Sequence, residues 1–284
     1  MSGIYWLASY PKSGNTWFRV FLQNLLEDGD RPVDINKLAT GRLASHRGWL
    51  DDVLGFDSAD LDADEVERLR PEVYRWSSRD GEITYHKIHD AYIFTADDEP
   101  LVSREATRGA LYILRNPLDV LSSFANRIGS SLDKAIACME NQQHVLCESR
   151  KQLPDQVRQK LLSWSGHVLS WVDEPTLSCH VLRYEDMLVD PVAAFTGAVR
   201  FLGLPDDPVR IEKAIRFSDF EELAGQETEK SFCEQSPRAE RFFRHGKSGI
   251  WRDRLSPEQI ARIIADHGEV MRRFGYLDAD GRPL

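Results

Sequence analysis

The stretch that most constrains the fold is residues 4–27, IYWLASYPKSGNTWFRVFLQNLLE. An uncharged run of aromatic and β-branched residues from Ile4 to Ser9 predicts a buried strand. A tight loop from Tyr10 to Asn15 follows, and apolar residues then recur at helical spacing from Thr16 to Glu27. Such a strand–loop–helix unit aims free backbone N–H groups and the positive end of a helix at one point, which predicts a phosphate site.

The loop also carries side chains that suit a phosphate. Lys12 supplies a mobile positive charge, Ser13 and Thr16 supply hydroxyl donors, and Gly14 allows the backbone to approach a ligand closely. The ordinary nucleotide-triphosphate loop requires Gly, four residues and then Gly-Lys-Ser/Thr. Here the lysine precedes the only loop glycine, and no Gly-Lys pair is present. A plain surface turn between a strand and a helix is the competing interpretation.

The segment Tyr10 to Trp17, YPKSGNTW, resembles the 5′-phosphosulfate loop of the sulfotransferases, Tyr-Pro-Lys-Ser-Gly-Thr-Thr-Trp, with Asn15 as the one change. These enzymes use 3′-phosphoadenosine-5′-phosphosulfate (PAPS) and release PAP. The resemblance implies a three-layer, P-loop-like α/β fold with a central parallel sheet flanked by helices. It also implies cofactor contacts from six residues of this loop: Lys12, Ser13, Gly14, Asn15, Thr16 and Trp17.

Length and composition indicate the number of domains and argue against a membrane protein, a metal site of cysteines and a nucleic-acid-binding protein. The 284 residues contain no linker, repeat or low-complexity run, so we expect one domain over residues 1–284. No apolar run approaches a membrane span and no leader pattern is present, so a soluble, cytoplasmic protein is expected. The four cysteines lack metal-ligand spacing, and no metal is required. The net charge of −10 argues against a nucleic-acid partner.

Residues 82–94, EITYHKIHDAYIF, predict a strand followed by a turn. Period-2 alternation puts Lys87 and His89 on one side of the strand and His86 on the other. Active-site residues gather at the carboxyl edge of parallel sheets. Sulfotransferases have a Lys-x-His at this place in the chain, with the histidine as catalytic base. The resemblance therefore assigns catalysis to His89, assisted by Lys87, and sets His86 aside.

Residues 110–128 repeat the strand–turn–helix theme, with a buried-type strand over 110–114 and a helix that Asn116 caps. Arg115 stands at the end of the strand, where a structural salt bridge is the competing interpretation. The pattern Arg-x-x-x-Asp-x-x-x-Ser is matched from Arg115 to Ser123 and resembles the family's 3′-phosphate site. A guanidinium offers a planar fork for phosphate oxygens.

Three later segments extend the resemblance. Tyr184, in a Tyr-Glu-Asp segment, matches a tyrosine that approaches the adenosine, and Ser218 and Phe220 resemble a pair that contacts the adenine. Residues 225–250 read as a basic, glycine-bearing loop that suits a phosphate lid. Its members include Arg238, Arg241, Arg244, His245, Gly246 and Lys247. Within it Arg244, His245 and Gly246 match the family's cofactor lid, although His245 replaces the usual lysine.

The remaining elements are expected as a helix begun at residues 62–65, two helices within 131–173, a strand over 178–188, and helices over 191–202, 207–224 and 256–275. His144 and His167 are expected to be structural or exposed. The aromatic residues of the acidic region 28–82 form either core or the wall of an acceptor pocket: Trp49, Phe56, Tyr74 and Trp76. The family's dimerisation sequence is poorly matched, with Ala261 where its closing Glu is expected, so a homodimer stays open.

Together these motifs predict an enzyme that moves a sulfuryl group from PAPS to a hydroxyl of a small-molecule acceptor. His89 would take the acceptor proton, and Lys12 would neutralise charge that grows on the leaving phosphate oxygen. A small-molecule kinase is the alternative enzyme, but the Gly-Lys-Ser/Thr loop that it needs is absent. A non-catalytic nucleotide-binding protein is the third interpretation, and binding alone would not require the base His89.

Overall fold

The computed structural model describes residues 2–79, 81–149, 152–235 and 241–284. The chain forms two compact units, each assembled from separate stretches. Unit 1 comprises residues 1–10, 41–112 and 141–181, and unit 2 comprises residues 11–40, 113–140 and 182–284. The single domain expected over residues 1–284 stays a prediction.

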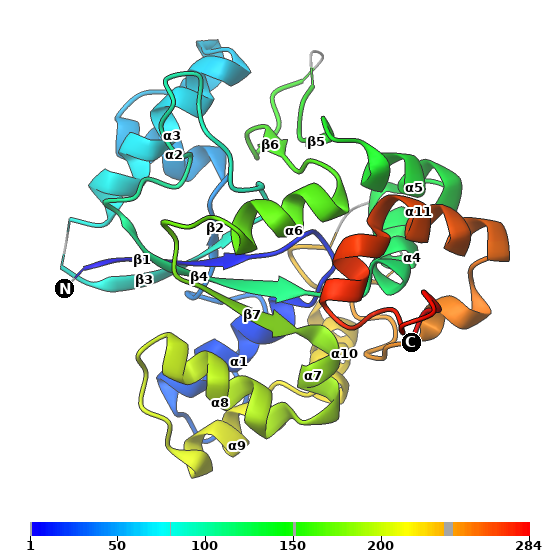
Figure 1. Cartoon of the computed structure of the whole chain (residues 1–284). Helices are drawn as coiled ribbons and strands as arrows, with labels where there is room; N and C mark the ends of the chain where they lie inside the picture. The colour runs from blue at the N-terminus through cyan, green and yellow to red at the C-terminus, as the bar shows by residue number, and fades with distance from the viewer. Residues whose placement is uncertain (1, 80, 150–151, 236–240) are drawn as a thin grey trace. The chain divides into compact units, whose positions relative to one another are not determined.

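Unit 1 is built on a parallel β-sheet with the strand order β2-β3-β1-β4-β7 (Figure 1). The strands are β1 (Gly3–Ala8), β2 (Arg42–Leu43), β3 (Ile83–Ile88), β4 (Thr107–Leu114) and β7 (Cys179–Arg183). The last residues of β4 and β7 belong to unit 2. The pairs β1–β3, β1–β4 and β2–β3 are parallel, and every residue of the central strand β1 is buried. The predicted strands at 4–9 and 110–114 and the α/β class are confirmed.

Three helices and a short antiparallel ladder complete unit 1. They are α2 (Arg47–Leu54), α3 (Ala63–Ser77), α6 (Trp164–Val172), β5 (Val145–Leu146) and β6 (Gln159–Lys160), with a 3-10 turn η1 at Ser58–Asp60. Helix α3 begins within residues 62–65, where a helix start was expected, and Asp62 and Glu65 form a capping box there. Helix α6 lies over one face of the sheet (Figure 1), where His167 contacts Tyr112 of β4 at 2.7 Å.

Unit 2 is helical. Its elements are α1 (Asn15–Glu27), α4 (Pro117–Ile128), α5 (Leu132–Glu140), α7 (Tyr184–Val189), α8 (Pro191–Phe201), α9 (Pro208–Arg216), α10 (Phe220–Lys230), η2 (Ile250–Asp253) and α11 (Pro257–Arg273). Helices α1, α8 and α9 pack together, and α4, α5 and α11 form a second group (Figure 1). Phe21 of α1 stacks on Phe195 of α8 with ring centroids 4.1 Å apart, so the predicted apolar face of α1 is a core face.

Several predicted boundaries are wrong. The predicted helix over 207–224 is two helices, because Asp219 caps a new helix by accepting the Glu222 N–H at 2.8 Å. The expected loop over 225–250 therefore begins only after α10 ends at Lys230. The predicted strand over 178–188 ends at Arg183, and α7 follows at once. Val145 and Leu146 lie in the region 131–173, where two helices are predicted, but they form β5 and pair with β6 instead.

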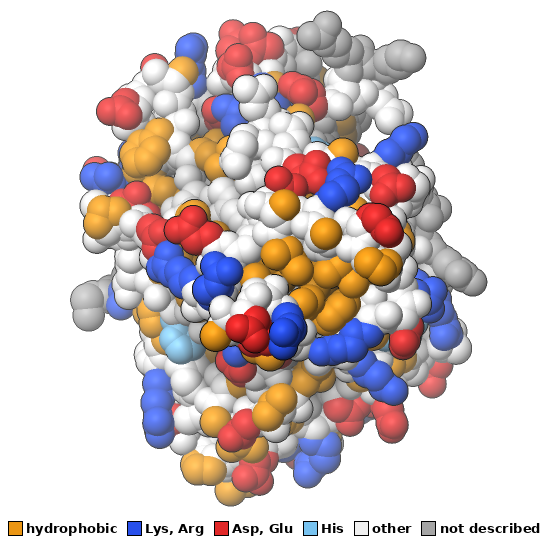
Figure 2. Space-filling model, turned by 45° about the vertical axis from the view of Figure 1, so that its right-hand side comes forward, with side chains coloured by type: hydrophobic (Ala, Val, Ile, Leu, Met, Phe, Trp, Pro, Cys, Tyr) orange, Lys and Arg blue, Asp and Glu red, His pale blue; other side chains and the backbone are white. Residues whose placement is uncertain are grey.

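The surface shows no field of one sign on the face drawn in Figure 2, where acidic and basic side chains are interspersed. That mixture agrees with the expectation that nucleic acid is not a partner, which stays a prediction. Across the described ranges, no helix has both the length and the apolar character needed to cross a membrane.

Candidate active site

The loop before α1 adopts a backbone that few residues tolerate. Lys12 has φ = 74° and Gly14, the N-cap of α1, has φ = 103°, so both lie in the left-handed region. A Cβ on Gly14 would come within 2.6 Å of Cδ2 of Tyr184. Glycine is thus required at this position both for its conformation and for close packing. The side chains of the other predicted loop contacts, Ser13, Asn15 and Thr16, are buried beside it.

Arg115 contacts both the loop before α1 and the predicted lid. Its guanidinium donates to the backbone oxygen of Lys12 at 3.3 Å and to that of Lys247 at 2.9 Å. Its Cζ lies 4.0 Å from the ring centroid of Tyr184, a cation–π distance. These contacts are carbonyl oxygens and a ring, so they differ from the structural salt bridge considered for this residue.

Two buried donors in the same cluster have no hydrogen-bond partner within the described part of the chain. They are the Nε–H of Arg115 and the indole N–H of Trp17. The indole packs edge-on against Tyr184 with centroids 5.6 Å apart. Burial raises the pKa of the Tyr184 phenol, so this ring is neutral. An unsatisfied buried donor is costly, and anionic oxygens of a bound nucleotide would satisfy it. The cluster therefore fits the phosphates of PAPS.

The predicted lid contacts the start of α10. Gly246 has φ = 60°, and a Cβ there would lie 2.4 Å from the ring of Phe220, so Gly246 and Phe220 touch as closely as a glycine allows. Both residues were predicted to contact the cofactor. Arg244 is half-buried and His245 is exposed in the same segment. Arg238 lies outside the described residues.

Two carboxylates that the sequence analysis does not identify accept hydrogen bonds from backbone N–H groups of the lid and its flank. Asp119 of α4 accepts hydrogen bonds from the N–H groups of Gly249 at 2.7 Å and Trp251 at 3.1 Å. Glu227 of α10, itself buried, accepts from the N–H groups of Phe242 at 2.6 Å and Phe243 at 3.0 Å. The sequence signal for Asp119 is its place as the acidic residue of the Arg-x-x-x-Asp-x-x-x-Ser pattern.

Lys12 lies against the same segment. Its Nζ is 3.8 Å from the centroid of the Phe242 ring, a close cation–π contact. Phe242 in turn is tied to Glu227 through its backbone. The amine of the predicted catalytic lysine therefore contacts an aromatic ring of the predicted lid segment.

His245 stands where the family has a lysine. Partial burial, together with repulsion from Arg244, Arg254, Arg115 and Lys247, lowers the pKa of its imidazole below the ordinary value. The ring is consequently neutral at pH 7 in this arrangement.

Two predicted cofactor contacts have other neighbours. Ser218 is fully buried, and its hydroxyl donates to the α9 carbonyls of Ala214 at 2.9 Å and Ile215 at 3.1 Å, a bonding pattern typical of the end of a helix. Ser123 is half-buried on α4. Their roles toward PAPS stay predictions.

The predicted base lies in unit 1, directly after β3. Ala8 and Ile88 are register partners at the carboxyl ends of β1 and β3, so Ser9 and His89 follow side by side. Nδ1 of His89 lies 2.8 Å from the backbone oxygen of Ser9. Because a carbonyl oxygen only accepts, Nδ1 must carry the proton, and in the neutral ring the lone pair is on Nε2.

His86 has a different environment from His89. Its ring stacks on Trp49 at 4.6 Å with an interplanar angle of 5°, and burial lowers its pKa to about 4. Trp49 and Tyr74 are buried core residues, whereas Phe56 and Trp76 are exposed by about half, at 49% and 58%. Lys87 is buried within the strand.

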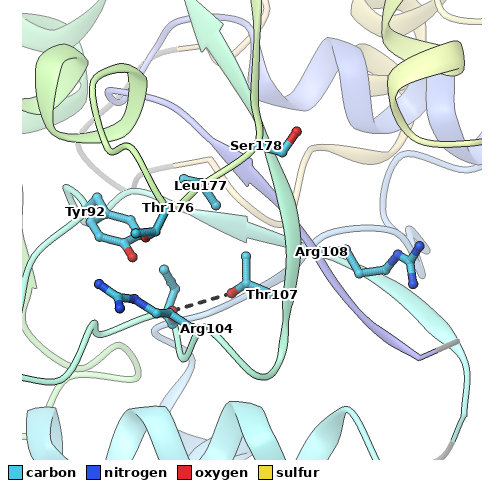
Figure 3. A pocket seen from close by; sticks show the side chains of 8 residues that line it. Tyr92, Arg104, Thr107, Arg108, Thr176, Leu177 and Ser178 are labelled. Carbon is cyan, nitrogen blue, oxygen red and sulfur yellow. Dashed lines mark hydrogen bonds between the residues drawn. The ribbon is translucent and has the colours of Figure 1, made fainter.

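A small pocket of about 50 Å³ lies beside the first residues of β4 and the residues that precede β7 in the chain. It contains none of the predicted site residues; Tyr92, Arg104, Thr107 and Thr176 are among its lining residues. In Figure 3 the side chains of Arg104 and Arg108 point to opposite sides, so they do not converge on one anion. Across the described ranges no cluster of three or more His, Cys, Asp or Glu is arranged to hold a metal.

The chain is similar to known proteins in both sequence and fold. The profile of the family described as "Sulfotransferase domain" matches residues 4–275, and the chain therefore belongs to the sulfotransferase family. It is 25% identical to a flavonol 3-sulfotransferase of Flaveria bidentis over 90% of this chain and 78% of that protein. It is 24% identical to cytosolic sulfotransferase 1 of Arabidopsis thaliana over 90% of this chain and 75% of the relative.

Solved structures show the same fold. A mouse sulfotransferase complexed with PAP aligns with a TM-score of 0.57 at 20% identity, covering 95% of this chain and 85% of that one. A retinol dehydratase with androsterone and PAP aligns with a TM-score of 0.60 at 19% identity, covering 95% and 80%. The predicted family, fold and enzyme class are confirmed: the chain is a sulfotransferase.

Proposed function

We propose that the chain transfers the sulfuryl group of PAPS to a hydroxyl of a small-molecule acceptor, with His89 as the general base. The hydrogen bond from Nδ1 of His89 to the Ser9 carbonyl carries this proposal, since it fixes the ring and leaves a lone pair on Nε2. Nε2 takes the acceptor's hydroxyl proton as the new S–O bond forms.

Residues of unit 2 would hold the nucleotide. The loop at Lys12 to Trp17 would bind the 5′-phosphate at the start of α1, and Arg115, Ser123 and Arg244 would bind the 3′-phosphate. The rings of Tyr184 and Phe220, with Ser218, His245 and Gly246, would line the rest of the nucleotide site. When bound, PAPS supplies an activated sulfuryl group.

Two lysines would supply the positive charge that stabilises the leaving phosphate and the sulfuryl oxygens. Lys12 would place its ammonium beside the oxygen of the leaving phosphate, and Lys87 would assist at the sulfuryl oxygens. The left-handed backbone at Lys12 and its contact with Phe242 support a specific placement of that amine. Metal is not required in this scheme, because lysines and backbone donors provide the positive charge that magnesium provides in phosphoryl transfer.

The acceptor is proposed as a small hydroxyl compound, with phenols as the first class to test. The flavonol sulfotransferase of Flaveria bidentis supports that choice. The names of the Arabidopsis relatives support a cytoplasmic location. The homodimer stays open, and regions 38–82 and 124–180 are proposed to form the acceptor pocket.

Two measurements test the function. Calorimetry without magnesium should show PAP binding more tightly than ATP, and labelled PAPS should transfer its sulfuryl group to members of a panel of phenols, alcohols and sugars. Tighter ATP binding that requires magnesium would support a kinase instead. PAP binding without turnover on any acceptor class would support a non-catalytic nucleotide-binding protein.

In the same titrations, Arg115→Ala should remove most of the preference for PAP over AMP. Losing a charged hydrogen-bond partner costs roughly 1.5–3 kcal/mol of binding, about 10- to 100-fold in Kd. The variant also loses the bonds to Lys12 and Lys247, so AMP binding serves as the control for general damage to the site. An unchanged ratio of PAP to AMP affinity would place the 3′-phosphate elsewhere.

His245→Lys should bind PAP several-fold more tightly than the natural chain at pH 8, and the advantage should shrink toward pH 5.5. The lowered pKa leaves His245 neutral at pH 8, and an anionic ligand raises that pKa, so PAP binding takes up a proton as pH falls. The titration of free PAP, with a second phosphate pKa near ~6, is common to both proteins and cancels in the ratio of the two Kd values. A pH-independent ratio of the two Kd values would contradict the contact.

A further inference from the structure

The turn that directly follows β3 is held by two side chains of α6. The backbone oxygen of His89 accepts a hydrogen bond from Nε2 of His167 at 3.0 Å. The next backbone oxygen, that of Asp90, accepts one from Nε1 of Trp171 at 3.0 Å. His167 and Trp171 are one helical turn apart and both fully buried. One face of α6 thus fixes two successive peptide groups, the first of which belongs to the proposed base.

The rest of the turn is fixed as well. The carboxylate of Asp90 forms a bidentate pair with Arg70 at 2.9 and 2.7 Å, and both side chains are buried. The backbone N–H of Ala91 donates to the oxygen of Lys160 at 2.8 Å. Rotation of the peptide groups after His89 would break several buried hydrogen bonds, each costly to leave unmade.

The chemistry of His167 allows one arrangement only. Nε2 faces a carbonyl oxygen, so it must be the donor, and Nδ1 must then accept from the hydroxyl of Tyr112 at 2.7 Å. Burial lowers the pKa of His167 to about 4, so the ring is neutral at physiological pH. An apolar residue would fill the same space without these two bonds, and the ring is therefore more than core filling.

We propose that His167 is a positioning residue for sulfuryl transfer: its imidazole, kept in one tautomer by Tyr112, orients the peptide group that carries the His89 side chain. This inference rests on the proposed function, in which His89 is the base. The base is anchored at both ends, through its ring to Ser9 and through its backbone to His167. A displacement of about 1 Å at a reacting group can cost 10²-fold in rate.

The test compares three variants of the full-length protein with labelled PAPS and quercetin, or with the first acceptor that the panel gives. His167→Phe removes both bonds, Tyr112→Phe removes the group that selects the tautomer, and His167→Gln keeps a donor near the Nε2 position. We expect kcat to fall roughly 10- to 100-fold for His167→Phe and less for Tyr112→Phe. His167→Gln should recover most of the loss, and PAP affinity should stay within twofold throughout.

A readout without turnover comes from protein labelled with ¹⁵N-histidine. The His89 ring, identified by its absence in His89→Ala, should show a protonated Nδ1 in the natural chain. That single tautomer should be lost in His167→Phe and kept in His267→Phe. His267 is an equally buried histidine of α11 that serves as the control for lost stability.

The double variant separates this inference from the function on which it rests. In a His89→Ala background, His167→Phe should have no further effect on residual turnover. A further loss there, or unchanged kcat and tautomer in folded His167→Phe and Tyr112→Phe, would overturn the positioning role while His89 stays the base. Normal turnover by His89→Ala would instead overturn the proposed function. If His167→Phe does not fold, Tyr112→Phe and His167→Gln decide by the same criteria.

Discussion

Replacing His89 with alanine should lower kcat about 10²- to 10⁴-fold while the affinity for PAP stays nearly intact. A positioned general base contributes about this much to the rate of proton transfer. The base acts on the acceptor's hydroxyl rather than on the nucleotide, so the two measurements should separate. The acid limb of the pH–rate profile reports protonation of Nε2, and it should vanish in whatever activity the variant retains.

His86→Ala is the matched control. His86 lies three residues earlier and is also buried, but its ring stacks on Trp49. Its removal should lower the free energy of unfolding by about 1–3 kcal/mol and change kcat little. Should folded His86→Ala be inactive while His89→Ala turns over normally, the assignment of the base would fall. The cofactor assignment, which rests on unit 2, would survive.

Lys12→Ala should reduce kcat about 10²- to 10³-fold, by a larger factor than it weakens PAP binding. Removing one preorganised electrostatic group at a developing charge has effects of this size, because the interaction grows in the transition state. The variant also loses the contact with Phe242, so its melting temperature should be recorded beside kcat and the PAP Kd.

Lys213→Ala controls for the loss of one positive charge from unit 2. Lys213 pairs with Asp28 and belongs to none of the predicted contacts with cofactor or acceptor. Its turnover should stay within twofold of the natural chain. Near-normal turnover by Lys12→Ala would remove Lys12 from the mechanism and leave it a binding residue at most.

The phosphate loop could be predicted from the sequence because its requirements are local. A buried strand, a glycine with positive φ and an amphipathic helix lie within residues 4–27, and each leaves a signal in residue type and spacing. Arg115 and Tyr184 could be added because each follows directly on a strand at a recognisable motif. Their packing about Gly14, by contrast, joins segments far apart in the chain and leaves no signal in residue spacing.

Other contacts left no such signal. Asp119 reaches the N–H groups of Gly249 and Trp251 across 130 and 132 positions, and backbone donors carry no residue identity that a sequence could show. The break between α9 and α10 was missed because apolar periodicity continues through Phe217 and Phe220, while capping by Asp219 decides the boundary. His167 was assigned a structural or exposed role, since its two bonds depend on residues far away in sequence.

The left-handed backbone of Lys12 has a consequence for engineering this enzyme. A side chain other than glycine costs about 1–2 kcal/mol in that conformation, so the folded chain stores strain at this residue. A stability-guided redesign would choose glycine at position 12 and would delete the proposed catalytic amine with the same substitution. Thermal stability and turnover therefore place opposite demands on position 12. Thermostabilised variants of this enzyme should be sought with Lys12 unchanged.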